Sequence, residues 1–345
     1  MFPASHEPLA RRFERFARRE CHVSRLYERL SLGIAQDHDV LGIAAQAQPG
    51  QPIPNLLLGA VHFLLLQGVV HPLAAYYPSL TPTPPPPVDP YPAFHAFCLE
   101  HREALLTLIS CRLVQTNEVR RCGCLLPAFA LIASRQPGRP LALVEIGASA
   151  GLNLLWDRYG YDYGEGGRFG DPGSPVQIAC ELRGSARPPL SHAFPTIATR
   201  VGIDLNPVDV RDPDAVLWLR ALVWPDEVGR AEVLLKALGI AQQSPPRLIG
   251  GDATERLAEV LAAIPDDQRL CVFHTHTVNQ FPPEARAHLS ALLAEHGRAR
   301  SLARLSVEWL GAEHPRLELT CFEAGTVTDH HLAYCGSHGE WLEWL

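Results

Sequence analysis

The sequence predicts an α/β fold with a parallel sheet, preceded by a helical region. Residues 141–155 have the pattern of a buried strand, a small-residue turn and the start of a helix. Further strand-like apolar runs at 197–205, 247–250 and 270–275 are each followed by a helical pattern. Strands that alternate with helices favour a parallel sheet with helices on both faces. Before these runs the chain has helical patterns separated by proline-rich breaks, which predict the helical region.

Composition limits the class of protein. The 345 residues are 47% hydrophobic and 19% charged, which is globular composition. We expect a helical region over 1–135 and the α/β domain over 136–345. The formal net charge of -7 does not favour a nucleic-acid partner. The nine cysteines are scattered, which favours reduced thiols and a cytoplasmic protein. The apolar stretch 56–66 is too short to span a bilayer, so we expect a soluble protein without a membrane partner. The sequence predicts no oligomeric state.

The helical region divides at identifiable breaks. Helical spacing of apolar residues predicts a helix over Leu9–Leu32, interrupted near Cys21, and a second one over Asn55–Val70. Thr81–Pro92 contains consecutive prolines and predicts an extended connection. Helical patterns return at Phe94–Ser110 and Leu125–Ala133.

The segment just before the last of these helices is unusually polar. One of its residues, Thr116 or Asn117, would suffice as a cap for that helix. The segment holds more polar groups than one cap needs, so we expect it to bind substrate or to close a pocket through Gln115, Asn117, Glu118 and Arg121.

The turn after the first strand carries the strongest motif. Gly147, Ser149 and Gly151 alternate after Glu145, and such small residues allow a ligand to approach the backbone. A helix that follows would offer free N–H groups. This E-x-G-x-S-x-G stretch resembles the first motif of class I S-adenosylmethionine-dependent methyltransferases. The alternative is a turn with a purely structural role. The resemblance implies that the cofactor binds at Glu145, Gly147, Ala148, Ser149, Gly151 and Asn153.

Longer motifs point to one family. The stretches QTNEV, LVEIGASAGLNLLWDRYGYDYG, GDPGSPV, GIDLNPVDV, LVWPDE and HGEWLEWL resemble the bacterial family called domain of unknown function 2332. The resemblance runs from the helical region to the last residues. It implies a Rossmann-like, class I methyltransferase-type sheet, and it implies no particular activity.

Acidic residues end the next two strand candidates. The methyltransferase resemblance implies that Asp204 accepts hydrogen bonds from the cofactor ribose and that Asp252, with Ala253, lies beside the adenine. Asp252 also suits the cap of the helix that follows. Asp204 lies much further along the chain than the usual separation of about 20 residues, which predicts an insertion at about 159–196.

Some substrate candidates lie in or near the insertion and in the helical stretch after Asp204. Trp156, Asp157 and Asp171 are candidates near the insertion. Trp224 of the WPDE motif would stack on a planar ligand or pack in a core before a new helix.

The end of the 270–275 strand is the best-placed cluster for chemistry. Ligands of open α/β sheets bind at the carboxyl ends of strands, which is where His274, His276 and Gln280 fall. Either histidine could act as a general base, and Gln280 would contact substrate. The alternative is a metal shared with Asp329, His330 or His331, but H-x-H spacing alone predicts no metal.

The chain ends with three more strand candidates at 302–310, 317–322 and 328–335. Too few residues separate the first two for a helix, so the order of these strands is left open. The pattern as a whole predicts a protein that binds S-adenosylmethionine and transfers its methyl group to an unknown small molecule. A metal-dependent or acid/base enzyme and a non-catalytic nucleotide-binding module are the alternatives.

Overall fold

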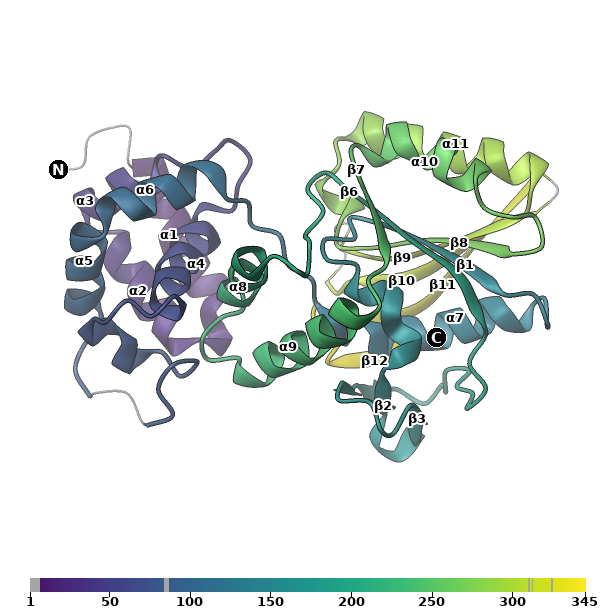
Figure 1. Ribbon diagram of the computed structural model, residues 1–345, viewed down its shortest axis with the longest axis horizontal. Coiled ribbons are helices and arrows are strands. Elements are labelled where there is room, and N and C mark those ends of the chain that lie inside the picture. The colour runs from purple at the N-terminus through teal and green to yellow at the C-terminus, as the bar shows by residue number, and fades with distance from the viewer. Residues whose placement is uncertain (1–6, 84–86, 310, 312, 324) are drawn as a thin grey trace. The chain divides into compact units, whose positions relative to one another are not determined.

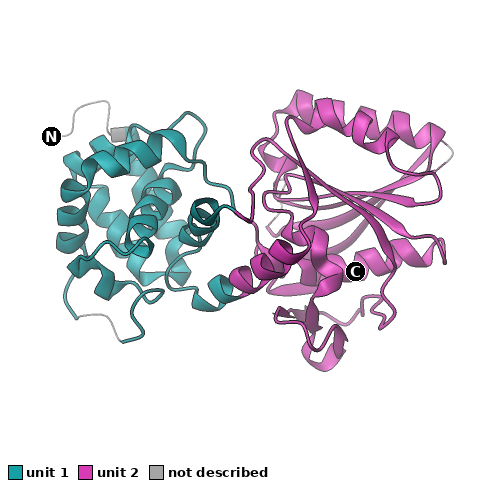
Figure 2. Ribbon diagram, viewed as in Figure 1, with its two compact units in different colours: residues 1–116, 212–232 teal, residues 117–211, 233–345 magenta. Residues whose placement is uncertain are grey.

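The computed structural model describes residues 7–83, 87–309, 311, 313–323 and 325–345. The chain forms two compact units (Figure 2). Unit 1 comprises Met1–Thr116 and Asp212–Glu232, and unit 2 comprises Asn117–Arg211 and Val233–Leu345. Each unit is described by itself below.

Unit 1 is helical in its described part (Figure 1). Its elements are α1 (Glu7–Arg19), η1 (Cys21–Val23), α2 (Arg25–Ile34), α3 (His38–Ala44), α4 (Ile53–Leu66), η2 (Pro72–Tyr76), α5 (Tyr91–Glu100), α6 (Arg102–Cys111) and α8 (Pro213–Ala221). The predicted break near Cys21 is confirmed. The predicted helix Phe94–Ser110 is two helices that meet at His101, and α3 has no counterpart among the predictions. Within the predicted connection Thr81–Pro92, residues 84–86 lie outside the described residues.

The core of unit 1 explains why residues 212–232 belong to this unit. Helix α4 is buried along almost its whole length, and Trp218, Ala221 and Leu222 of the α8 region pack into the same cluster. Buried His62 of α4 fixes this contact, because its Nδ1 lies 2.9 Å from the Ala221 carbonyl. Its Nε2 lies 2.8 Å from the Ser79 hydroxyl.

Unit 2 is built on a large mixed sheet. Its helical elements are η3 (Val119–Arg121), α7 (Cys122–Ser134), η4 (Leu152–Arg158), η5 (Gly164–Gly166), α10 (Ala253–Ala262), η6 (Val278–Gln280) and α11 (Pro283–Ala299). Helix α9 (Val228–Gln243) begins in unit 1 residues and ends in unit 2 residues. The strands are β1 (Leu141–Ile146), β2 (Gly160–Asp162), β3 (Arg168–Gly170), β4 (Gln177–Ala179), β5 (Glu181–Arg183), β6 (Ile197–Asp204), β7 (Arg247–Gly250), β8 (Arg269–Thr275), β9 (Leu302–Glu308), β10 (Arg316–Glu323), β11 (Thr326–Cys335) and β12 (Trp341–Trp344).

The strand order confirms an α/β fold with a mostly parallel sheet. The large sheet runs β5-β12-β11-β10-β9-β8-β1-β6-β7, with parallel pairing from β9 through β7. Helices α10 and α11 cover one face and α7 covers the other (Figure 1). Side chains alternate between the faces of a strand. Val144 and Val272 therefore face α10 and α11, whereas Glu145 and Phe273 face α7.

The helix predicted to begin at Leu152 is not an α-helix. A 3₁₀ helix, η4, takes its place and is kinked at Leu155. Side chains capture the carbonyl groups that an α-helix would need for propagation. Tyr159 donates its hydroxyl hydrogen to the Leu152 carbonyl at 2.7 Å, and Arg200 donates to the Leu154 carbonyl at 2.9 Å.

The predicted insertion and the chain end extend the structure at one side. Strands β2, β3 and β4 form a small separate sheet, and β5 pairs with β12 at the edge of the large sheet. Strands β9, β10 and β11 follow one another in an antiparallel meander, and β12 was not predicted. Over the part of the chain that the structure describes, no helix combines the length and apolar character needed to cross a membrane.

Candidate functional site

The chain changes its direction of travel across the sheet between β1 and β8. From β1 it moves outward to β6 and β7, then returns to β8 and continues to β9 on the other side. The connections that leave the adjacent strands β1 and β8 therefore lead to strands on opposite sides of this pair. In open α/β sheets this switch point is where ligands bind. We call the loops 147–151 and 276–280, with the side chains around them, the switch-point edge.

The glycine turn has a packing role of its own. Gly147 and Gly151 have left-handed φ values of 73° and 72°. A Cβ atom on Gly147 would lie 2.2 Å from Thr277 Oγ1, and one on Gly151 would lie 2.5 Å from Pro246 Cγ. Glycine is therefore required here by backbone conformation and by close packing of the loop after β8 on the loop after β1.

Glu145 is a buried carboxyl group with one partnered oxygen. Its side chain belongs to a residue that is 1% exposed, and its Oε1 accepts a hydrogen bond from Asn153 at 3.2 Å. Oε2 has no hydrogen-bond partner among the described residues. Desolvation, with the negative charge of Asp204 adding to it, raises the pKa of Glu145 well above its usual value. A cationic ligand group would favour the ionised form.

Asp204 ties the end of β6 to the glycine turn. One carboxylate oxygen accepts the Ser149 N–H at 2.8 Å, and the other accepts the Asn206 N–H at 2.8 Å. Ala148 and Ser149 are buried, and Ser149 Oγ lacks a partner within the described chain.

Asp252 and Ala253 follow β7 at the same edge of the sheet. Asp252 caps α10 by accepting the Thr254 N–H at 2.8 Å, and its side chain is exposed. Ala253 is buried in the core cluster beneath α10. Glu145, Asp204 and Asp252 thus lie at or just beyond the carboxyl ends of three neighbouring strands.

Backbone strain marks both loops of the switch-point edge. Ser149 and His276 are the described non-glycine residues with positive φ, at 52° each. Non-glycine residues in this region are uncommon and gather at functional sites. His276 Nε2 is buried with no partner among the described residues. Burial, followed by the positive charge of Arg121, lowers the pKa of His276 to about 3, so the imidazole is neutral at neutral pH.

His274 lies on the other face of the sheet and holds a loop in place. It is fully buried on the α11 side, and its Nδ1 lies 2.6 Å from Glu308 Oε1. Glu308 also accepts the backbone N–H groups of Thr277, Val278 and Asn279. Desolvation alone would raise the pKa of Glu308, but the hydrogen bonds from His274 and these N–H groups lower it. The pair therefore positions the loop that carries His276.

Three of the polar residues before α7 reach the edge. Asn117 Oδ1 accepts the Leu152 N–H at 3.1 Å, which uses the donor that the start of η4 would otherwise offer a ligand. Glu118 accepts the Arg120 N–H at 3.2 Å. Arg121 donates through Nε to the Ser337 carbonyl at 3.0 Å, and its Nη1 lies 3.5 Å from Thr275 Oγ1. Exposed Gln280 donates to the His276 carbonyl at 2.7 Å.

Other predicted substrate residues lie elsewhere. Trp156 is buried and stacks on Phe129 of α7, with 4.8 Å between ring centroids. Asp157 pairs with Arg200 at 2.8 Å, and Asp171 is exposed in a turn.

The remaining two substrate candidates belong to unit 1. Trp224 packs against Phe16 and Tyr27, in agreement with its alternative role in a core. Gln115 is also a unit 1 residue and is half-buried.

The residues considered for a metal lie on strands that are not adjacent in the sheet. His331 pairs with Glu318 of β10, which pairs with Ser306 of β9, which pairs with His274. Three strand spacings amount to about 14 Å. Within the described ranges, no three His, Cys, Asp or Glu residues gather closely enough to hold a metal ion.

Sequence reasoning missed Glu308, Thr275 and Thr277. Thr277 contacts the site only because two loops that are distant in sequence meet there, and no local pattern shows this. Glu308 had a usable signal, because a lone acid at the carboxyl end of an apolar strand is also what singled out Glu145.

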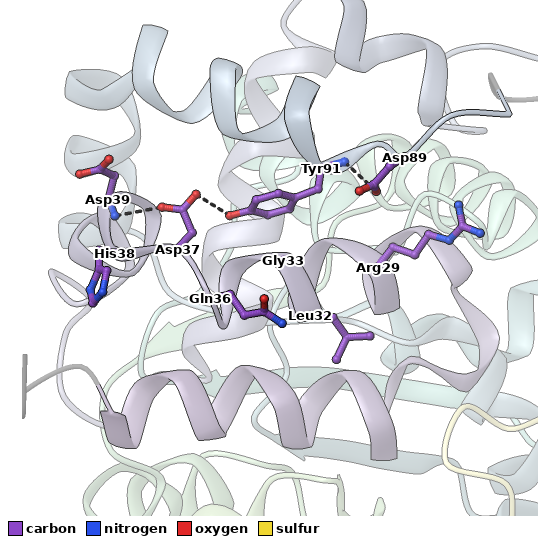
Figure 3. A pocket seen from close by; sticks show the side chains of 9 residues that line it. All are labelled: Arg29, Leu32, Gly33, Gln36, Asp37, His38, Asp39, Asp89 and Tyr91. Atoms are coloured by element: carbon purple, nitrogen blue, oxygen red, sulfur yellow. Dashed lines mark hydrogen bonds between the residues drawn. The ribbon is translucent and has the colours of Figure 1, made fainter. Parts of the chain in front are cut away.

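Unit 1 contains a cavity of its own, of about 850 Å³ (Figure 3). Asp37 is central to its wall, caps α3, and accepts a hydrogen bond from the Tyr91 hydroxyl at 2.7 Å. Its second contact is with His95 Nδ1 at 2.5 Å. These contacts tie α3 to α5, so they account for the half-buried carboxylate without a ligand.

The fold and the switch-point edge define an α/β protein. Its candidate site residues lie where the path of the chain across the sheet reverses, between β1 and β8. Over residues 10–344 the chain matches the family described as "Uncharacterized protein conserved in bacteria (DUF2332)", and it belongs to this family. No curated protein and no solved structure matches the chain.

Proposed function

We propose that unit 2 binds S-adenosylmethionine at the switch-point edge and transfers its methyl group to a small molecule. The observation that carries the proposal is that three of the twelve buried polar atoms without partners among the described residues belong to the switch-point edge: Glu145 Oε2, Ser149 Oγ and His276 Nε2. Buried polar atoms are ordinarily hydrogen-bonded, so unpartnered ones at the switch-point edge support a ligand there.

The residues present suit this cofactor in several respects. The Glu145 carboxylate would accept hydrogen bonds from the ammonium of the methionine end. The Asp204 carboxylate, which accepts the Ser149 and Asn206 N–H groups, would accept hydrogen bonds from the ribose hydroxyls. The order β7-β6-β1-β8-β9 supports a Rossmann-like arrangement of the methyltransferase type. The meander at β9–β11 and the short η4 are departures from that type.

The protein groups would act by position and by proton transfer. When bound, the cofactor supplies an electrophilic methyl group on its sulfonium. Neutral His276 would take the proton from a hydroxyl or amine of the acceptor. Glu308 and His274 hold the loop that aims His276. Such a reaction requires chiefly orientation, so a protein nucleophile is not needed.

Calorimetric titration with S-adenosylmethionine and S-adenosylhomocysteine tests the proposal. We expect saturable binding by the native chain, loss of binding in Asp204→Ala, and unchanged binding in the exposed control Glu165→Gln. Absence of binding by the folded native protein would overturn the proposal. Binding without methylation of any acceptor would favour a nucleotide-binding module.

A further inference from the structure

We infer that the glycine turn, residues 147–151, takes an amino group of its ligand and rejects a phosphate, and that Asn117 sets this specificity. The inference rests on the proposed function in taking the switch-point edge as the binding site. It adds the chemical class of the ligand group at the turn. Glycine-rich turns that bind a phosphate do so through free backbone N–H groups and the start of the following helix.

The N–H groups of this turn already have acceptors within unit 2. Each acceptor is a carbonyl or carboxylate oxygen of a neighbouring loop or strand end. Four of the five N–H groups are used in this way: those of Gly147 and Ala148 donate to the Ile203 carbonyl at 2.8 and 3.3 Å, that of Ser149 donates to the Asp204 carboxylate at 2.8 Å, and that of Gly151 donates to the Ala148 carbonyl at 2.7 Å. The turn is therefore shaped like a phosphate-binding turn but has given up the donors that such a turn needs.

Asn117 takes the next donor along the chain. Its Oδ1 accepts the N–H of Leu152, the first residue of η4, at 3.1 Å. Asn117 is 9% exposed and Leu152 is fully buried, so water does not compete for this hydrogen bond. The η4 segment is a 3₁₀ helix with a kink at Leu155, and it lacks the long row of aligned peptide dipoles that attracts an anion. A phosphate placed here would meet few N–H donors.

The unpartnered side-chain atoms at the turn suit a donor instead. Glu145 Oε2 and Ser149 Oγ have no partner among the described residues, and both residues are 1% exposed. Asn153 of η4 donates to the other Glu145 oxygen at 3.2 Å, which fixes the carboxyl group beside the turn. An ammonium group has three N–H donors and would pair with the Glu145 carboxylate. A phosphate at the same place would face a like charge or would hold Glu145 in its protonated form.

S-adenosylhomocysteine and ADP are matched probes, because they share adenosine and differ in the group on its 5′ carbon. The first carries an amino acid with its ammonium group, and the second carries a diphosphate. We expect calorimetric titration of the native chain to give at least about ten-fold tighter binding of S-adenosylhomocysteine, because hydrogen bonds between charged groups are the strong ones. Asn117→Ala frees the Leu152 N–H for a phosphate oxygen and should shift the ratio of the two dissociation constants toward ADP by about ten-fold.

The ratio separates specificity from loss of structure, because a general loosening of unit 2 weakens both ligands alike. Asn117→Asp is the conservative control, since its carboxylate still accepts the Leu152 N–H, and it should not shift the ratio toward ADP. Equal affinity of the native chain for the two probes, or the native ratio in folded Asn117→Ala, overturns the inference. Should Asn117→Ala fail to fold, Glu145→Gln decides. Loss of this carboxylate should weaken S-adenosylhomocysteine and spare ADP, and equal weakening of both overturns the inference.

Sodium pyrophosphate keeps the two proposals distinguishable. If the native chain binds neither adenosine compound, the proposed function fails, and the turn is tested by pyrophosphate alone against sodium chloride at equal ionic strength. Thermal unfolding should then show stabilisation of Asn117→Ala beyond that of the native chain. An equal response of the two proteins to pyrophosphate overturns the inference.

Discussion

Glu145 shows at the scale of one residue how a site costs stability. A carboxyl group this deeply buried, with one oxygen unpartnered within the described chain, is unfavourable in the ionised form. Its contribution to stability is complete below the ordinary glutamate pKa and is lost as the pH rises toward the raised pKa of the folded state. At neutral pH, the ligand-free protein is therefore destabilised by its own site.

Replacing Glu145 with glutamine should stabilise the protein while abolishing cofactor binding. Glutamine can still accept the hydrogen bond from Asn153, but it does not ionise. We expect the free energy of unfolding at pH 7 to rise, because ionisation of this buried carboxyl costs stability and glutamine removes that cost. Chemical denaturation at pH 7 and pH 4 measures the effect, which should disappear at pH 4.

The exposed residue Glu165 provides the control for this change. Glu165→Gln should alter neither stability nor binding of S-adenosylhomocysteine. If Glu145→Gln lowers stability at pH 7, burial of an ionised carboxyl is not the dominant effect at this position.

At the scale of elements, the site is a contact between two loops. The loop after β1 and the loop after β8 meet where Thr277 faces Gly147. The Glu308 carboxylate fixes the loop after β8 by accepting backbone N–H groups of that loop. Asp204 fixes the loop after β1 by accepting the Ser149 N–H. The geometry of the switch-point edge thus depends on contacts between loops more than on either loop alone.

Gly147→Ala should separate backbone strain from this contact. The left-handed φ costs an alanine about 1–2 kcal/mol, and collision of its Cβ with Thr277 adds a further destabilisation of about 1–3 kcal/mol. Gly138→Ala is the matched control, because Gly138 has φ 84° and a Cβ atom added there would meet nothing within 4 Å. Denaturation should therefore show a larger loss for Gly147→Ala.

A double variant tests the partner in this contact. Thr277→Ala removes Oγ1 and Cγ2, the two nearest atoms, and should recover part of the extra loss of Gly147→Ala. Equal losses in Gly147→Ala and Gly138→Ala would mean that the loops separate freely.

The sequence predicted helices and strands well where apolar residues recur in a regular pattern or a continuous run. The parallel strands β1 and β8 could be placed because their apolar runs are nearly continuous and include β-branched residues. The 3₁₀ form of η4 could not, because it depends on Tyr159 and Arg200 capturing carbonyl groups. His274 shows the same limit at the site, since its face of the sheet follows from the register of β8 and its function from Glu308, distant in sequence.

At the scale of the whole molecule, each unit has a core and a buried neutral histidine. The core cluster of unit 1 surrounds α4, and that of unit 2 lies under α10 and α11. Burial lowers the pKa of His62 in unit 1 to about 4 and, with Arg121, that of His276 in unit 2 to about 3. Both histidines take up a proton more readily in the unfolded chain.

Acid should therefore remove the stability that these two neutral histidines contribute, in a range where carboxylates with ordinary pKa values stay ionised. A lowered histidine pKa contributes stability that is complete above the unfolded pKa of about 6.5 and is lost as the pH falls toward the folded value. At pH 5 the loss is about 2 kcal/mol for each histidine. His62→Gln should flatten the pH dependence of unit 1 unfolding, and His276→Gln should flatten that of unit 2. Calorimetry between pH 7 and pH 5 follows the unfolding transitions of the two units. The control variants are His22→Gln for unit 1 and His288→Gln for unit 2, because both histidines are exposed. A pH dependence that survives both buried replacements would assign acid sensitivity to other groups.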